Sequence, residues 1–211
     1  MSALLDAVEL AELAPAFAEP VHDAQAVFRL LLEAMSRPGR VQSLPAPCRD
    51  TLGHPTGLAP ALAATLLTLL DADTRLWVAP ALDTPALRAW ARFHCGVQWV
   101  QQPEQADFAL LAAHEAQPEL LQRLCEGSDA APQDSATALI ALPDVTPGAG
   151  PLRWRGPGIE HEHRLTLPGL SDAFWAWRRE QPQRFPCGLD FFFAAGERVV
   201  ALPRSTRVEV D

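Results

Sequence analysis

Two pairs of arginines have the type and the spacing to bind an anion. Arg37 and Arg40 flank a Pro-Gly pair directly after a helical stretch, and Arg204 and Arg207 lie near the carboxyl end of the chain. A guanidinium group donates planar pairs of hydrogen bonds that match a phosphate or a carboxylate. All 17 basic residues are arginine, so no lysine shares this task. These four arginines are therefore the candidate anion ligands.

The first pair also has a structural interpretation, as the end of a helix. Pro38 disfavours helical geometry at Arg37, and Gly39 can take the left-handed conformation that commonly ends helices. Cations at this end meet free carbonyl groups and the negative pole of the helix dipole, which gives no help to anion binding. Helix capping or a contact with another subunit is therefore the favoured interpretation of this pair, and anion recognition is the alternative.

Two histidines, His161 and His163, have the spacing of neighbours on one face of a strand, where they could share a metal ion. A third ligand of the right type is not apparent in the sequence. Exposed polar residues are therefore the favoured interpretation, no metal site is predicted, and the role of the two histidines stays open.

Cys187 and Asp190 lie where the apolar run of residues 189–195 begins. Cys187 would be a nucleophile only beside a histidine in an electropositive site, so a buried structural thiol is the favoured interpretation. Asp190 interrupts the apolar run, and a carboxylate there must be exposed, paired or hydrogen-bonded. We expect Asp190 to pair with an arginine rather than to act as an acid or a base.

The residue types that are missing exclude several mechanisms. The chain contains no lysine, tyrosine or asparagine. A pyridoxal-phosphate enzyme needs a lysine amine for its Schiff base, and Walker A loops and kinases need a lysine at the phosphates. Gly156-Pro157-Gly158 lacks the strand, glycine loop and helix of a phosphate cradle, so we interpret it as a turn. No catalytic residue and no cofactor are predicted.

Composition limits the class of protein and its partners. The 211 residues suit a single domain, with residues 1–20 as a loosely packed lead, and the net charge of −9 disfavours a nucleic-acid partner. The first residues are acidic where a signal peptide would be basic and apolar, which predicts a cytoplasmic protein. The longest apolar run, Leu58–Leu70, is too short to cross a membrane.

Apolar spacing predicts the helices that must carry these residues. In the first, an apolar stripe that includes Val27, Phe28 and Leu31 faces the core. A second coincides with the run Leu58–Leu70. Further helices are expected at 85–95, between the cap Thr84 and the stop Gly96, at Pro118–Cys125, and from the cap Ser171 onward.

Short apolar runs predict the strands, and the Pro- and Gly-rich residues 42–57 predict a loop. The expected strands are Leu76–Val78, Val97–Val100, Asp107–Ala112, Thr137–Leu142, a hairpin from Leu152, and two strands joined across Ala195-Gly196-Glu197. Strands that alternate with helices indicate a layered α/β fold.

The helix after Ser171 carries the aromatic run Phe174-Trp175-Ala176-Trp177, which places aromatic rings on several sides of the helix. These rings either fill the core or form a dimer or partner interface, because buried and interface aromatics look alike in a sequence.

Four segments of this chain together resemble one known family. They are FRLLLEAMSRPGRV, LLTLLDADTRLWV, RGPGIEHEHRL and FPCGLDFFFAAGERVVALPRSTRV, in this order across residues 28–208. The ordered set is similar to the PhnH subunit of the bacterial carbon–phosphorus lyase system for phosphonate metabolism.

The resemblance implies a cytoplasmic homodimer that supports a transferase and works with the subunits PhnG, PhnI, PhnJ and PhnL. That machinery, the alpha-D-ribose 1-methylphosphonate 5-triphosphate synthase, transfers the ribose triphosphate of ATP onto an alkylphosphonate and displaces adenine. The resemblance also implies a three-layer α/β/α fold with a mixed central sheet, like that of the pyridoxal-phosphate-dependent transferases but without their cofactor lysine. The alternatives are a phosphonate- or nucleotide-binding protein with a vestigial transferase fold, and an independent small-molecule enzyme.

Overall fold

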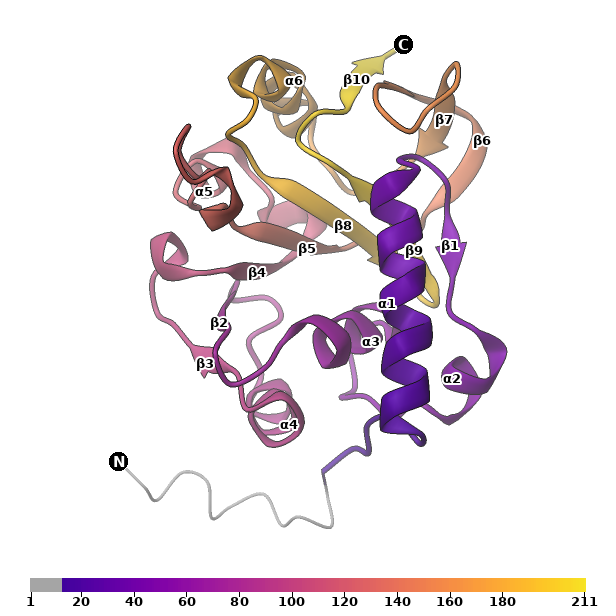
Figure 1. Cartoon of the computed structure of the whole chain (residues 1–211), viewed down its shortest axis with the longest axis vertical. Coiled ribbons are helices and arrows are strands. Elements are labelled where there is room, and N and C mark those ends of the chain that lie inside the picture. Colours follow the sequence, from indigo (N-terminus) through magenta and orange to yellow (C-terminus); the bar gives the residue numbers. More distant parts are fainter. Residues whose placement is uncertain (1–12) are drawn as a thin grey trace.

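The computed structural model describes residues 13–211 and arranges them as helices around two β-sheets (Figure 1). The α-helices are α1 Pro20–Ser36, α2 Ala46–Thr51, α3 Pro60–Leu69, α4 Pro85–Cys95, α5 Pro118–Leu121 and α6 Asp172–Glu180. The 3-10 helices are η2 Pro103–Gln105, η3 Ala113–Glu115, η4 Pro132–Asp134 and η5 Gln181–Arg184. The strands are β1 Gln42–Ser43, β2 Arg75–Val78, β3 Gln98–Trp99, β4 Phe108–Ala112, β5 Thr137–Ala141, β6 Thr146–Arg155, β7 His163–Thr166, β8 Asp190–Ala195, β9 Arg198–Leu202 and β10 Arg207–Val210.

The larger sheet has seven strands in the order β1-β9-β8-β5-β4-β2-β3. The strands from β3 to β8 in this order run parallel, whereas β9 and β1 pair antiparallel at one edge. The central strands are short and almost wholly apolar because both of their faces are buried. This arrangement confirms the mixed α/β class.

The smaller sheet has three antiparallel strands in the order β10-β6-β7. Trp154 of β6 is the register partner of both His163 in β7 and Val208 in β10. The predicted hairpin is therefore confirmed, but β6 begins at Thr146, and its pairing with β7 shifts register between Pro147 and Leu152.

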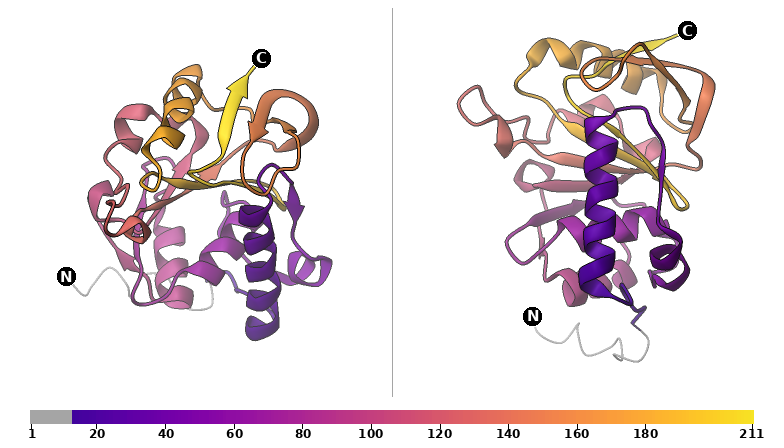
Figure 2. Two further views of the ribbon diagram at one scale, coloured as in Figure 1. Left: turned by 45° about the horizontal axis from the view of Figure 1, so that its top comes forward. Right: turned by 45° about the vertical axis from the view of Figure 1, so that its right-hand side comes forward.

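The two faces of the large sheet carry separate cores, because successive side chains of a strand point to opposite faces. Leu110, Leu139 and Phe192 belong to the first core, with buried residues of α1, α3 and α4. Leu111 and Ile140 belong to the second core, with α6 and the small sheet. Figure 2 shows α1 on one side of the large sheet and α6 with the small sheet on the other.

Local signals located two helices correctly. The Thr84 side chain accepts a hydrogen bond from the Leu87 backbone N–H at the start of α4, and Gly96 ends that helix with φ +71°. The Ser171 side chain likewise accepts from the Phe174 backbone N–H at the start of α6.

Two predictions about the first 57 residues are wrong. Phe28 does not face the core, since it is 51% exposed; the predicted Val27 and Leu31 are buried, together with Leu30 and Ala34. Residues 42–57 are not all loop, since they contain β1, which pairs with β9, and the short helix α2. Proline in the first turn of α2 is compatible with a helix start.

The aromatic rings of α6 fill the core of this chain. Phe174, Trp175 and Trp177 are buried in the second core, where Phe174 packs edge-on against Phe191 and Phe193. The core interpretation of this helix is therefore correct, and the interface interpretation is wrong for these side chains.

Part of the expected loose lead is packed. The Trp90 indole N–H donates to the Pro15 carbonyl at 3.1 Å, and the Gly53 N–H donates to the Ala16 carbonyl at 3.3 Å. Residues 1–12 lie outside the described residues. Within 13–211, no helix combines the length and the apolar character that a membrane crossing requires.

Candidate functional site

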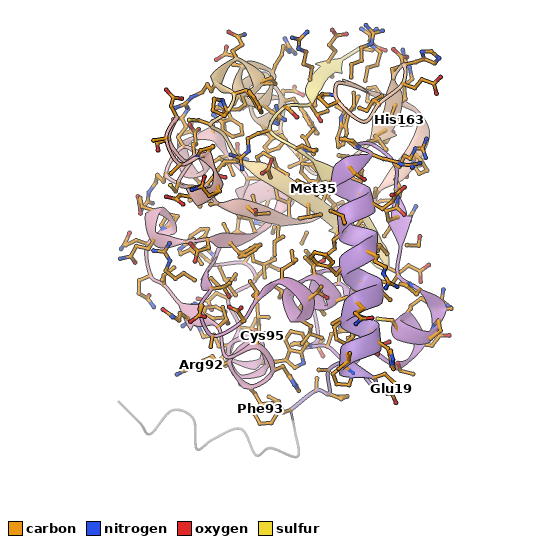
Figure 3. The ribbon with its side chains drawn as sticks, viewed as in Figure 1. Glu19, Met35, Arg92, Phe93, Cys95 and His163 are labelled. Atoms are coloured by element: carbon orange, nitrogen blue, oxygen red, sulfur yellow. The ribbon has the colours of Figure 1, made fainter. Side chains whose placement is uncertain are left out.

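The first hollow, of about 570 Å³, lies between the end of α1 and the β6–β7 strands. It is lined by Gly39, Arg40, Val41, Gln42, Pro147, Gly148, Glu162, His163 and Arg164. Figure 3 shows His163 beyond the end of α1 at which Met35 lies. Burial and, to a smaller extent, the nearby Arg40 charge lower the pKa of His163 below its usual value.

Gly39 lets the chain after α1 turn closely past His163. Its φ is +86°, and a Cβ at this position would lie 2.7 Å from the Cβ of His163. A glycine is therefore required on both conformational and steric grounds. The predicted helix stop is confirmed, and it delivers the exposed Arg40 to the first hollow.

Arg37 does not line the first hollow. Its backbone N–H donates to the Glu33 carbonyl at 3.0 Å, and its side-chain Nε lies 3.1 Å from Glu33 Oε1. The two side chains are 51% and 43% exposed. Arg37 therefore forms a surface ion pair at the end of α1.

The second hollow, of about 460 Å³, lies beside the loop between β9 and β10. It is lined by Arg155, Gly156, Pro157, Pro182, Phe185, Ser205 and Arg207. The Phe185 ring and Arg207 are exposed, and Arg155 Nη2 pairs with Glu162 Oε2 at 2.8 Å. Guanidinium groups bind anions, and an exposed aromatic ring stacks on planar groups. This surface therefore suits a ligand that has an anionic group and a planar group.

Arg204 does not line this hollow, and its side chain binds the protein itself. Its Nη2 lies 2.6 Å from Asp190 Oδ2, its backbone N–H donates to Asp190 Oδ1 at 2.7 Å, and Nη2 also donates to the Ser135 hydroxyl. Nη1 donates to the carbonyls of Pro132 and Pro186. The side chains of Arg204 and Asp190 are only 15% and 18% exposed. The expected pairing of Asp190 with an arginine is confirmed.

The structure therefore does not bring the four predicted arginines to one site. Arg40 lines the first hollow and Arg207 lines the second. Arg37 and Arg204 are held in ion pairs with carboxylates of their own chain.

Glu162 connects the two hollows. It lines the first hollow, and it pairs with Arg155 of the second and with Arg164. The turn at 156–158 also links them, because a Cβ at Gly158 would lie 2.1 Å from the Ser36 carbonyl oxygen at the end of α1. The interpretation of this segment as a turn is confirmed.

Arg178, which lies beneath the β9–β10 loop, is not among the residues that the sequence predicted for a site. Its side chain on α6 is wholly buried, and its Nη2 donates to the Pro203 carbonyl at 2.7 Å and to the Thr206 carbonyl at 3.0 Å. Burial lowers its pKa to about 10, against the opposing effect of the Asp190 charge. The sequence held one signal for the burial of Arg178. It follows Phe174 by four residues, and residues at i and i+4 share a helix face.

His161 is exposed, as its favoured interpretation expected, whereas Cys187 is not the fully buried thiol that was expected. His161 lies before β7 and is 86% exposed, so it does not share a strand face with His163. Cys187 is only partly buried, and its Sγ donates to Asp129 Oδ1 at 3.6 Å. Burial and Asp129 raise the pKa of this thiol, which disfavours a nucleophilic thiolate. Among residues 13–211, no three metal-binding side chains gather as a metal site requires.

The carboxyl ends of β2 and β4 are occupied by the chain itself. Ligands of open parallel sheets bind beside a strand at which successive connections run to opposite sides. β2 is such a strand, because β3 lies on one side of it and β4 on the other. Here the Glu115 carboxylate accepts from the backbone N–H groups of Ala81 at 2.9 Å and Ala112 at 3.1 Å. Both donors already hold an anion, so the two hollows are the better candidates for a ligand site.

Comparisons with known proteins agree over nearly the whole chain. The family model described as "Bacterial phosphonate metabolism protein (PhnH)" matches residues 15–209. A protein of Rhizobium meliloti (strain 1021), named alpha-D-ribose 1-methylphosphonate 5-triphosphate synthase subunit PhnH, is 36% identical over 197 residues, which are 92% of this chain and 94% of that protein. A Stutzerimonas stutzeri protein with the provisional name C-P lyase subunit protein HtxG is 34% identical over 192 residues, which are 88% of this chain and 86% of that protein. With matches of this extent, the chain belongs to the PhnH family of bacterial phosphonate metabolism proteins.

Proposed function

We propose that this chain is the PhnH subunit of an alpha-D-ribose 1-methylphosphonate 5-triphosphate synthase, within the carbon–phosphorus lyase system. It supports transfer of ribose triphosphate from ATP to an alkylphosphonate, as a cytoplasmic homodimer that assembles with PhnG, PhnI, PhnJ and PhnL. The observation that carries this proposal is the match of residues 15–209 to the family, together with a relative of nearly equal extent that bears this name.

The proposed role is accessory rather than catalytic. The chain has no lysine, and the Cys187 thiol faces Asp129 with a raised pKa. The fold in this proposal is a three-layer arrangement of the pyridoxal-phosphate transferase type without the cofactor lysine. The packing of α1, α3 and α4 on one sheet face supports it, although the opposite face is covered by the small sheet as well as by α6.

Reconstitution tests this function. The chain is expressed with PhnG, PhnI, PhnJ and PhnL, the complex is purified through a tag on PhnI, and adenine release from ATP with methylphosphonate is measured by chromatography. We expect the chain to co-purify, adenine release to fall when the chain is omitted, and the chain alone to release none. Turnover by the isolated chain, or a complex that forms and works equally well without it, would contradict the proposal.

A second candidate function is binding of a phosphonate or a nucleotide without conversion. The second hollow supports it, because the exposed Arg207 offers a guanidinium group beside Ser205, the exposed Phe185 ring and Arg155, which is paired with Glu162. A nucleotide presents an anionic phosphate chain and a planar base, which match these two kinds of surface. Titration calorimetry of the purified chain with ATP, and separately with methylphosphonate, measures this binding directly.

A further inference from the structure

The loop between β9 and β10 is held from its buried side by one arginine. Arg178 Nη2 donates to the carbonyls of both Pro203 and Thr206, and the Thr206 N–H closes the same turn onto the Pro203 carbonyl at 3.0 Å. The next residues to either side of Thr206, Ser205 and Arg207, line the second hollow. The shape of that wall therefore depends on a contact made by a side chain that does not itself line the hollow.

The rest of the Arg178 head is buried without partners, and two related residues carry buried polar atoms in the same condition. Within the described chain, its Nε and Nη1 have no hydrogen-bond partner, and neither do Gln181 Oε1 and Thr206 Oγ1. Gln181 follows Arg178 by three residues and so shares its helix face, and Thr206 is the residue whose carbonyl Arg178 binds. The four atoms are two donors, one amide oxygen that accepts and one hydroxyl that can donate or accept, all of them buried.

A water molecule matches this set of atoms better than an anion does. Water accepts from the guanidinium N–H groups and donates to the amide and hydroxyl oxygens, whereas an anion only accepts. Buried waters typically join about three polar groups that are otherwise unsatisfied. A bridging water would tie Arg178 to Gln181 and Thr206 and so connect the end of α6 to the loop.

We propose that Arg178 is a positioning residue for the second hollow: together with a bound water, it holds residues 203–207 so that Ser205 and Arg207 face a ligand. This inference rests on the proposed ligand-binding role of that hollow. Arg178 contacts the loop and the water, not the ligand.

The test compares Arg178→Met and Arg178→Lys with the matched control Arg179→Met, which changes the exposed neighbour on the same helix. Hydrogen exchange of the backbone N–H groups at 205–207, the dissociation constant for ATP and the thermal midpoint are measured for each. We expect Arg178→Met to speed loop exchange and to weaken ATP binding about tenfold, as for a lost hydrogen bond to a charged group. The thermal midpoint should hold or rise, because a buried charge without a carboxylate partner is removed.

The outcomes separate a positioning role from a purely structural one. Arg178→Lys retains the charge but lacks the planar fork, so it should lie between wild type and Arg178→Met in loop exchange and ATP binding. A lower thermal midpoint with unchanged loop exchange and ATP binding overturns the proposal. If the wild-type chain does not bind ATP, the binding function fails, while loop exchange still decides the role of Arg178.

Thr206→Val tests the water and also serves if Arg178→Met does not fold. Valine matches threonine in shape, so removal of a hydroxyl that binds the bridging water should lower the thermal midpoint and speed loop exchange. A raised midpoint would mean that the hydroxyl is truly unsatisfied, and it overturns the water bridge. A crystal structure would also overturn the water bridge if it showed a hydrophobic contact or a direct protein hydrogen bond, instead of a water, at Arg178 Nε and Nη1.

Discussion

The chain contains two segments of the form Arg-x-x-Arg, which have the same residue types and spacing but opposite environments. Arg37 and Arg40 follow α1 at the surface, where Arg37 pairs with Glu33 and both side chains are about half exposed. In the second segment, Arg204 is mostly buried against Asp190, and Arg178 supports the loop from below. Each segment directs one exposed arginine, Arg40 or Arg207, toward a hollow.

This difference shows that spacing alone does not determine what an arginine does. An exposed ion pair contributes about 0–1 kcal/mol, because water screens it and both side chains lose freedom. Breaking a buried pair costs about 3–5 kcal/mol, because it leaves a charge without compensation. The second segment is therefore the more rigid of the two, and a rigid wall loses less conformational entropy when it binds a ligand.

The largest expected effect on stability concerns the helices next to the two segments. These are α1, which ends before Arg37, and α6, which contacts the β9–β10 loop through Arg178. Trp175→Ala on α6 should lower the free energy of unfolding by about 3–5 kcal/mol, because it leaves a cavity in the second core. Phe28→Ala on α1 should change it by less than about 1 kcal/mol, since that ring is half exposed. Urea denaturation followed by circular dichroism measures both. Equal effects would remove the contrast between the two regions.

The next largest effect is the difference in stability that the two ion pairs, Arg204–Asp190 and Arg37–Glu33, provide. Asp190→Ala should lower the free energy of unfolding by about 3 kcal/mol, because it strands the mostly buried Arg204 charge. Glu33→Ala, which frees the exposed Arg37, should cost less than about 1 kcal/mol. The same denaturation experiment compares them, and a double-mutant cycle of Asp190 with Arg204 isolates the pair. A coupling energy near zero in that cycle would argue against this account.

The two exposed arginines distinguish the hollows as ligand sites. Arg207→Ala should weaken ATP binding about tenfold, as expected for one lost charge-assisted hydrogen bond. Arg40→Ala is the matched variant in the first hollow and should leave the affinity within about twofold. Titration calorimetry at fixed ionic strength measures both. A larger loss from Arg40→Ala would move the nucleotide site to the first hollow.

The smallest effect is a pH dependence specific to the first hollow. The pKa of His163 is lowered in the folded chain by burial and by Arg40, so the unfolded chain binds more protons between the folded pKa and the ordinary value of 6.5. His163 therefore makes stability rise with pH through this window and fall on acidification. We expect His163→Gln to flatten this part of the profile, measured as the urea midpoint from neutral pH downward. An unchanged slope in the variant would exclude His163 as the source.

Local sequence signals were sufficient wherever one element determines its own ends. Thr84 and Gly96 delimit α4 through a side-chain cap and a left-handed stop, which need no other part of the chain. Local signals were insufficient to predict which face of α1 is buried, because its sequence carries two apolar stripes. Packing against α3 and β9 buries the stripe with Leu30 and Ala34 and leaves Phe28 and Leu32 exposed, a choice that the helix alone does not make.

By itself, the sequence determined what chemistry is impossible and which family to expect. A chain without lysine forms no Schiff base on a lysine amine, whatever its fold, and the ordered segments across 28–208 pointed to the PhnH family. Only the tertiary structure decided which arginines are available to a ligand. Arg178 and Arg179 are adjacent and chemically identical, yet the rotation of about 100° per helical residue buries the first under the β9–β10 loop and leaves the second exposed. Availability depends on which side of α6 packs against the sheet, and contacts distant in the sequence set that orientation.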